Sequence, residues 1–459
     1  MTENAITIAW PDWARLEEES EARQEPSWLR ELRRRAFRLL QETPQPNGRD
    51  GDLSFLLQAE APQQVAEQRA AEGDEAAAGA QESLLVEAAA EMPLALVRDG
   101  KVSEAGQLVP QIVLAELGEA ARQYPDLVRP YLFNSALKPG QPEDETGFYL
   151  LLQAALWDWG LFLHLPAGVQ AEMPVGVLQQ ITAAGRRAFR HVLIVLEAGA
   201  ELDLLEETVG GAAVGAAWHG ATAREGDDGQ GNRPLLGQSW EVVLKEGAKL
   251  RLGLVQNLAA GGCTFRLGRA LLEKDATLEL FAVEVGGRWS RLQFETELIG
   301  QGASVSSFAL FLGTGRQRYH LDLGHLHRGE HTRSDMTVRG VLRDRAYTRF
   351  RGLGYIHFGA QGASSFQRTD TLLLSRTARA DVVPSLKIDE DDVQAGHGAA
   401  VGQVDEEALF YLMSRGLSRV QATRLIVEGF LQSLLDKATV PGVDRVVRLA
   451  ALKKIESQA

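Results

Sequence analysis

The chain has 459 residues, of which 45% are hydrophobic and 24% are charged, and its formal net charge is −14. This length predicts two or three globular domains, and the acidic balance argues against a nucleic-acid-binding surface. The single cysteine, Cys263, excludes an internal disulfide framework and a self-contained zinc or iron–sulfur site with cysteine ligands.

The first residues and the apolar runs predict a cytosolic protein with no membrane partner. The start, MTENAITIAWPDW, lacks the basic and apolar segments of a signal peptide. The longest apolar runs have the length of a strand, whereas a membrane span needs about 20 apolar residues. A reducing cytosol is therefore the expected compartment.

Residues 1–150 are predicted to form an N-terminal helical domain with an Ala/Glu-rich connector. In residues 25–46 the apolar residues follow the period of an amphipathic helix; they are Trp28, Leu32, Phe37 and Leu40. Residues 63–92 suit an exposed helix or a partly disordered connector equally well. Residues 110–135 again have helical spacing, and the Pro/Gly-rich stretch 137–147 predicts a domain boundary nearby.

Residues 151–403 are predicted to form a parallel β-helix core, that is, a β-solenoid. Runs of apolar and β-branched residues alternate with Gly-Ala or Asp-Ala turns, whose alanines are Ala200, Ala248, Ala276 and Ala303. The first spacing, of 48 residues, is about twice the other two, so we interpret it as two repeats of about 24–28 residues. No helix-length pattern separates the strands, which disfavours a doubly wound α/β sheet and leaves an antiparallel sandwich as the alternative.

Residues 404–459 are predicted to form a C-terminal helical domain. Asp405 is expected to cap a helix that stops at Gly416, and Ser418 and Gln421 have the spacing of a capping box. The next helix has an apolar stripe that we expect to be mostly local core, made of Ala422, Leu425, Ile426, Phe430 and Leu434. Gly429 in this helix suggests close approach of a second helix, and Pro441 is expected to start a last one.

The stretch DDVQAGHGAAVGQ, residues 391–403, contains three glycines around His397. A nucleotide-binding loop is disfavoured because no parallel α/β unit and no acidic residue at a following strand end accompany it. The alternatives are a tight turn that tolerates a histidine and a surface where His397 does chemistry. The phosphate-binding sequence G-x-x-x-x-G-K-[ST] occurs nowhere, so any ATP chemistry would belong to a partner.

Residues 320–335 hold four histidines: His320, His325, His327 and His331. On a strand, His325 and His327 would point to one face, as metal ligands must, and Glu330 and Asp335 could contribute. The alternative is a strand and turn whose histidines form local hydrogen bonds. Cys263 also has a structural and a chemical interpretation. We expect it to be buried and inert rather than a reactive thiol.

Residues 389–392 are four consecutive acids, which a polysaccharide-cleaving solenoid enzyme would use as paired carboxylates. A hydrated turn is the more ordinary interpretation of such a run. A carbohydrate-active β-solenoid enzyme nevertheless stays as an alternative function.

Residues 331–375 and 384–430 resemble the SufB/SufD family of the SUF iron–sulfur cluster assembly system, and residues 193–207 and 25–37 resemble it more weakly. The likeness covers most of residues 150–440. It implies N-terminal helices, a right-handed parallel β-helix core and a C-terminal helical domain.

At two places the sequence departs from the SufB pattern, and there it resembles the SufD branch of the family. Thr369 stands where SufB has a cysteine before an Asp-x-Leu-Leu stretch, and His397-Gly398-Ala399 replaces a His-Glu-Ala tripeptide. The resemblance implies a non-catalytic subunit that pairs with a SufB-like paralogue through the β-helix and docks a SufC-like ABC ATPase through the C-terminal helices. It also implies no tightly bound cofactor in the isolated chain, and a cluster held transiently at the interface with SufB.

The resemblance places His397 at that interface, where a neutral imidazole is a competent iron ligand. Ala395 stands where many relatives have a cysteine, which excludes a thiolate at this position. A purely structural role for His397 is the alternative. The residues expected to contact the ATPase are Arg415, Arg419 and Arg424. A SufB-like self-pairing scaffold, or a homodimer of the isolated chain, remains open.

Overall fold

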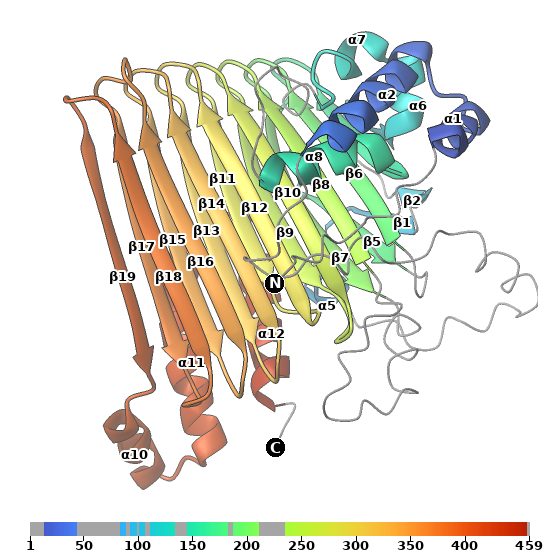
Figure 1. Cartoon of the computed structure of the whole chain (residues 1–459). Helices are drawn as coiled ribbons and strands as arrows, with labels where there is room; N and C mark the ends of the chain where they lie inside the picture. The colour runs from blue at the N-terminus through green and yellow to red at the C-terminus, as the bar shows by residue number, and fades with distance from the viewer. Residues whose placement is uncertain are drawn as a thin grey trace, which may run out of the picture.

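The computed structural model describes residues 13–43, 83–88, 92–98, 101–105, 111–133, 145–181, 187–210 and 235–456. The chain winds into a solenoid of two facing sheets, and successive strands alternate between them (Figure 1). Within the core each strand pairs in parallel with the strand two places further along the chain. The predicted parallel β-helix is thereby confirmed, and the antiparallel sandwich is not formed.

One sheet has ten strands in the described chain. They are β1 (Leu94–Arg98), β2 (Lys101–Ala105), β5 (Val175–Ile181), β7 (Glu201–Gly210), β9 (Lys249–Asn257), β11 (Thr277–Glu284), β13 (Ser304–Gly313), β15 (Arg333–Leu342), β17 (Ser364–Leu373) and β19 (Gln394–Gln403). The other sheet has nine described strands. They are β3 (Val113–Glu116), β4 (Trp159–Leu165), β6 (Arg187–Leu196), β8 (Leu235–Leu244), β10 (Cys263–Leu272), β12 (Trp289–Leu298), β14 (Arg318–His327), β16 (Tyr347–Ile356) and β18 (Arg379–Ile388).

Helices cover the outer faces of both sheets. Those of the N-terminal region pack on the nine-stranded sheet: α1 (Trp13–Ala22), α2 (Ser27–Glu42), α6 (Leu117–Gln123), α7 (Pro125–Val128) and α8 (Glu145–Leu156). The ten-stranded sheet carries α5 (Leu84–Ala88), α11 (Arg419–Leu435) and α12 (Val443–Glu456). Helix α10 (Glu406–Ser414) follows the end of β19 (Figure 1).

Alternating apolar side chains fill the space between the sheets, because successive residues of a strand point to opposite faces. Equivalent inward positions of successive coils stack on one another. Leu202, Leu250, Leu278 and Val305 stand in register on four such strands, and all are buried. A repeat that cannot bury its apolar face alone is stabilised in this way by its neighbours.

One corner of each coil, from the β6–β7 corner to the β16–β17 corner, is built by a residue in the left-handed conformation. These residues are Gly199, Gly247, Asp275, Gly302, His331 and Gly362, with φ between 55° and 73°. Each amide donates a hydrogen bond of 2.7–2.9 Å to a carbonyl of the next coil. The conformation explains the Gly or Asp of the predicted turns, and the alanines that follow are fully buried.

The spacing of 48 residues between Ala200 and Ala248 is one long coil and not two repeats. The amide of Lys249 donates to the carbonyl of Ala200 at 2.8 Å, so the two corners lie on neighbouring coils. Later coils are shorter: Thr277 pairs with Ser304, 27 residues on, and Arg333 pairs with Ser364, 31 residues on. The extra length falls on residues 211–234, which lie outside the described residues.

The helical prediction for residues 1–150 is incomplete, because β1, β2 and β3 belong to the sheets. β1 pairs with β2 and β3 pairs with β4, both antiparallel, at the first edge of each sheet. These three short strands were not predicted from the sequence. Of the proposed connector, residues 63–82 and 89–91 lie outside the described residues. The domain limits themselves stay a prediction.

The C-terminal helices have the predicted caps and part of the predicted stripe. Asp405 accepts from the amide of Glu407, and Ser418 and Gln421 form a full capping box. Ala422 and Leu434 of the stripe are buried and Phe430 packs against the core, whereas Leu425 is exposed; the buried face of α11 also contains Val427, Leu431 and Leu435. Gly429 marks no close helix approach, since a Cβ there would meet no atom within 4 Å.

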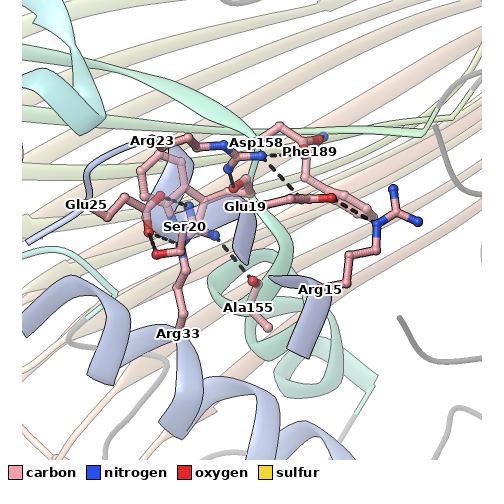
Figure 2. A network of polar contacts seen from close by, with 10 residues as sticks. Arg15, Glu19, Ser20, Arg23, Glu25, Arg33, Ala155, Asp158 and Phe189 are labelled. Carbon is pink, nitrogen blue, oxygen red and sulfur yellow. Dashed lines mark hydrogen bonds and ion pairs between the residues drawn. The ribbon is translucent and has the colours of Figure 1, made fainter. Parts of the chain in front are cut away.

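A buried ion pair joins α2 to the end of α8, which leads into the solenoid (Figure 2). Arg33 of α2 lies 2.7 Å from a carboxylate oxygen of Glu25, which also accepts from the hydroxyl of Ser20 at 2.6 Å. The same guanidinium donates to the carbonyl of Ala155 at 3.3 Å and lies 4.1 Å from the ring of Trp157. Burial lowers the pKa of Arg33, and this cost is offset by Glu25.

Candidate functional site at the open end of the solenoid

The last coil of the solenoid consists of β18 and β19. Each is the terminal strand of its sheet and pairs along one edge only, with β16 and β17 respectively. No other described strand pairs with the second edge. Unpaired amides and carbonyls of this kind are a template for strand pairing with another chain.

The last coil also exposes apolar side chains that earlier coils bury. Ile356 is fully buried, whereas Ile388, in register with it on β18, is 43% exposed. Val401 on β19 is 45% exposed, whereas Thr371, in register with it on β17, is buried. Apolar side chains exposed at an open sheet end are typical of a protein–protein contact surface.

His397 lies in the middle of β19, at this open end. It stands in register with Gln367, which is buried and donates to the carbonyl of Ser385 at 3.0 Å. His397 therefore occupies an inward-facing position of the coil. Its side chain is exposed because no described coil follows.

The glycines around His397 have no packing role within the chain. A Cβ at Gly402 would meet nothing within 4 Å, and at Gly396 and Gly398 it would make ordinary contacts of 3.4 Å and 3.6 Å. Glycine in a strand often marks a place where another backbone approaches closely. The glycines lie within a strand and not at a strand-to-helix turn, so they form no phosphate-binding loop.

His325 and His327 lie on β14 and face the interior together, as predicted. The Nε2 atom of His325 is 2.8 Å from the hydroxyl of Ser307, and both ring nitrogens of His327 are 2.8 Å from the hydroxyls of Thr332 and Ser334. Burial lowers the pKa of His325 to about 3 and that of His327 to about 4. Both rings are therefore neutral and engaged in local hydrogen bonds.

The structure does not bring the histidines of residues 320–335 together around one point. His331 builds a left-handed corner, and His320 lies on the outer face between the rings of Trp289 and Tyr347. Among the described residues no group of three or more His, Cys, Asp or Glu is arranged to hold a metal. The metal-site hypothesis stays a prediction to which the geometry adds no support.

The acidic run and the cysteine have ordinary structural surroundings. Asp389 accepts from the hydroxyl of Tyr355 at 2.7 Å, and Glu390 accepts from the amide of Gly359 at 2.8 Å, at an exposed corner. Cys263 is buried with Phe265 and Leu267 beneath the N-terminal helices, as expected.

The candidate arginines of the C-terminal helices make local contacts. Arg415 lies over the ring of Tyr411, Arg419 pairs with Glu406 at 3.2 Å, and Arg424 pairs with Glu428 at 2.7 Å. Beside them lies an exposed apolar patch, the α10–α11 patch, made of Phe410, Tyr411, Met413, Val420 and Leu425. One signal of this patch is visible in the sequence: Phe410 and Tyr411 are adjacent aromatics in a helix and cannot both face a core.

A Ser–His–Glu set was not anticipated from the sequence. The hydroxyl of Ser239 lies 2.8 Å from Nδ1 of His191, and Nε2 of His191 lies 3.2 Å from Glu241. The ring of His191 packs against that of Phe133 with centroids 4.0 Å apart and the planes tilted by 36°, and His191 and Ser239 are buried. Because no substrate can reach the buried hydroxyl, the set fastens the N-terminal helices to the sheet and does not catalyse.

Among the described helices, none is both long enough and apolar enough to cross a bilayer.

Comparison with known proteins identifies the family of the chain. Residues 179–430 match the family model described as SUF system FeS cluster assembly, SufBD core domain. The chain is 28% identical over 442 residues to the iron–sulfur cluster assembly protein SufD of Bacillus subtilis, covering 95% of this chain and 96% of that protein. It is 26% identical over 323 residues to SufB of the same organism, covering 70% of this chain and 64% of that protein. A SufBD family protein of Pyrococcus horikoshii is 28% identical over 350 residues, or 74% of this chain and 71% of that protein. Since the family model matches more than half of the chain, this protein belongs to the SufB/SufD family of the SUF iron–sulfur cluster assembly system.

Proposed function

We propose that this chain is a non-catalytic, cytoplasmic subunit of a SUF assembly complex, in the role of SufD. It pairs with a SufB-like paralogue through the open end of the solenoid and docks a SufC-like ABC ATPase through the α10–α11 patch. The likeness to SufD over nearly the whole of both chains supports this role. The observation that carries the proposal is the last coil, with its unpaired strand edges and its exposed inward-facing residues.

The open end favours a partner with the same architecture. A second solenoid can continue both sheets, because β18 and β19 each offer a free row of backbone donors and acceptors. Pairing would also bury Ile388 and Val401. A SufB relative matches 70% of this chain, so a paralogue would offer a related surface. A second copy of this chain is the competing partner.

The α10–α11 patch favours a protein partner of its own. Phe410 is 73% exposed, and arginines with acidic partners surround the apolar residues. An apolar centre with a polar rim is the usual composition of such a surface. The chain has no phosphate-binding loop of an ATPase, so ATP hydrolysis falls to the docked subunit.

His397 is proposed to face the cluster or its iron at the interface with the paralogue. Its neutral imidazole can bind iron, and its place on β19 puts it among the residues that pairing would cover. Cys263 is 1% exposed and lies beneath the N-terminal helices. Thiolate ligands for a transient cluster would therefore come from the paralogue.

Two reciprocal variants test the two surfaces in one experiment. The tagged chain is co-expressed with a SufB-like paralogue and a SufC-like ATPase and purified through its tag. Val401→Arg is expected to lose the paralogue and keep the ATPase, because a charge then lies at the sheet end. Phe410→Asp is expected to lose the ATPase and keep the paralogue. Each loss should be at least tenfold, since a buried interfacial anchor is worth about 2 kcal/mol or more.

The controls are exposed apolar residues elsewhere on the chain. Met173→Arg and Val86→Asp change side chains that are 47% and 53% exposed, and both should retain both partners. Capture of neither partner by the unaltered chain would contradict the proposal. If Val401→Arg instead abolished a dimer of this chain alone, the self-pairing scaffold would be favoured.

A further inference from the structure

A pocket of about 410 Å³ lies between the C-terminal helices and the solenoid. Its floor is formed where β13, β15, β17 and β19 end, and its roof comes from α10, α11 and α12. The size falls within the range of small-molecule sites, which are mostly apolar with a few placed polar groups.

Much of the lining is aliphatic. Leu312, Val341 and Leu373 come from the strand ends, and Val427, Ala451 and Ile455 come from the helices. Most of these side chains also belong to the core between helices and sheet. An apolar ligand body can therefore contact side chains that are already held in place.

The charged lining has more positive than negative groups. Four cations, Arg343, Arg376, Arg419 and Lys454, face two acids, Asp344 and Glu406. Both acids are already engaged. Glu406 pairs with Arg419 at 3.2 Å, and Asp344 accepts from the amide of Gly315 at 2.9 Å and lies 3.7 Å from Arg343. Within the described chain, Arg376 and Lys454 have no acidic partner.

Lys454 is held by an amide and not by a carboxylate. Its ammonium donates to Oε1 of Gln317 at 2.7 Å, and that oxygen also accepts from the amide of Thr314 at 3.0 Å. Burial lowers the pKa of Lys454 to about 8. An anion beside this amine would stabilise its charged form.

We propose that this pocket binds a small organic anion with an apolar body, of the class of a medium-chain carboxylate. The head group binds Lys454 and Arg376, and the chain lies along the aliphatic wall. An uncharged apolar ligand would leave the two cations without a counter-charge, and a small inorganic anion would leave the aliphatic wall uncovered. The pocket shares Arg419 and Val420 with the surface proposed for the ATPase, so its ligand is tested on the chain without partners.

Decanoate is a suitable probe, added to the full chain and followed by isothermal titration calorimetry. One saturable site is expected. Decanol, which has the same body without the charge, should bind at least about tenfold more weakly, because a hydrogen bond to a charged group is commonly worth a factor of that size. Inorganic phosphate, which has the charge without the body, should also bind at least about tenfold more weakly, because it buries no apolar surface.

Lys454→Met is expected to weaken decanoate binding at least about tenfold. Lys453→Met is the matched control: this neighbour pairs with Glu87 at 2.8 Å and does not line the pocket, so affinity should be unchanged. Thr423→Phe fills the pocket from α11 and should abolish binding, and it carries the test if Lys454→Met does not fold. The proposal is overturned if the unaltered chain shows no saturable binding, or if the pocket variants bind decanoate as tightly as the control.

Discussion

The two ends of the solenoid differ, although the same coil is repeated between them. At the N-terminal end each sheet finishes in a short antiparallel strand, β2 beside β1 and β3 beside β4, and helices cover the outer face of one sheet. At the C-terminal end, the ten-residue strands β18 and β19 are the last of their sheets and the coil exposes Ile388 and Val401. Very short edge strands are one way in which proteins protect a sheet edge from further pairing. We therefore call the N-terminal end the closed end, whereas the open end has the composition of an interface.

The interactions that stabilise the two halves differ as well. Near the closed end the buried polar groups include ion pairs, such as Arg33 with Glu25 and Arg190 with Glu206. Towards the open end Arg339 pairs with the buried Asp370, but the space between the sheets contains the neutral, hydrogen-bonded set of His327, Ser334 and Ser365. This contrast predicts different responses to substitution and to acid.

The largest effect is expected at the closed end. Arg33→Met leaves the carboxylate of Glu25 buried without its partner, and loss of one member of a buried pair costs about 3–5 kcal/mol. Urea unfolding followed by circular dichroism measures this loss. Arg30→Met is the control, because its pair with Glu21 is partly exposed and should contribute less than about 1 kcal/mol. Equal losses in the two variants would refute a special role for the buried pair.

Acid should destabilise the half that contains the neutral histidines. Because the folded-state pKa values of His325 and His327 are lowered to about 3 and 4, their contribution to stability is present above the ordinary value of 6.5. It is lost as the pH falls towards 4, by about 1.4 kcal/mol per pH unit for each ring.

Unfolding free energies at pH 7, 6 and 5 test this expectation. In the double variant His325→Gln, His327→Gln the free energy of unfolding should depend less steeply on pH than in the unaltered chain, whatever its value at pH 7. Hydrogen exchange at pH 5 should show coils near β14 opening before those beneath the N-terminal helices. If the free energy of unfolding of the double variant depended on pH as steeply as that of the unaltered chain, these two rings would not be the cause of the acid sensitivity.

The smallest effect on stability is expected at the open end itself. His397→Ala removes an exposed side chain, so the free energy of unfolding should change by less than about 0.5 kcal/mol. The complex should remain intact, while cluster formation, read from its visible absorbance, should be depressed. Gln394→Ala on the same strand is the control. Unchanged cluster formation in His397→Ala would contradict a functional role of that histidine.

Local signals in the sequence predicted much of the fold. The Gly-Ala and Asp-Ala corners were recognisable because a left-handed backbone restricts the residues that can form it. The caps at Asp405 and Ser418 were recognisable because few side chains accept from a helix's first amides. His325 and His327 were correctly placed on one face of a strand because strand periodicity is local.

The errors arose where packing between distant segments decides the outcome. Leu425 fits a helical stripe, yet it points away from the side of α11 that packs on β15 and α12. The strands β1, β2 and β3 are too short to be told from helix by period alone, and they form through pairing of β1 with β5 and β2 and of β3 with β4. The sequence placed the end of the core at residue 403, but the exposure of Val401 could not be predicted, since it depends on which strand follows.

The 48-residue coil between Ala200 and Ala248 has a consequence for how such a chain can change. Register resumes after it without a shift, since Glu201 stands opposite Lys249 just as Lys249 stands opposite Thr277. The corner between β7 and β8 thus accommodates additional chain, whereas from β8 onward the described corners on both flanks are four to seven residues long. Successive corners of one flank hydrogen-bond to each other, so a change in length at one would displace its neighbours. Insertions and deletions during evolution are therefore expected to accumulate at the β7–β8 corner, and an engineered tag or reporter domain belongs there.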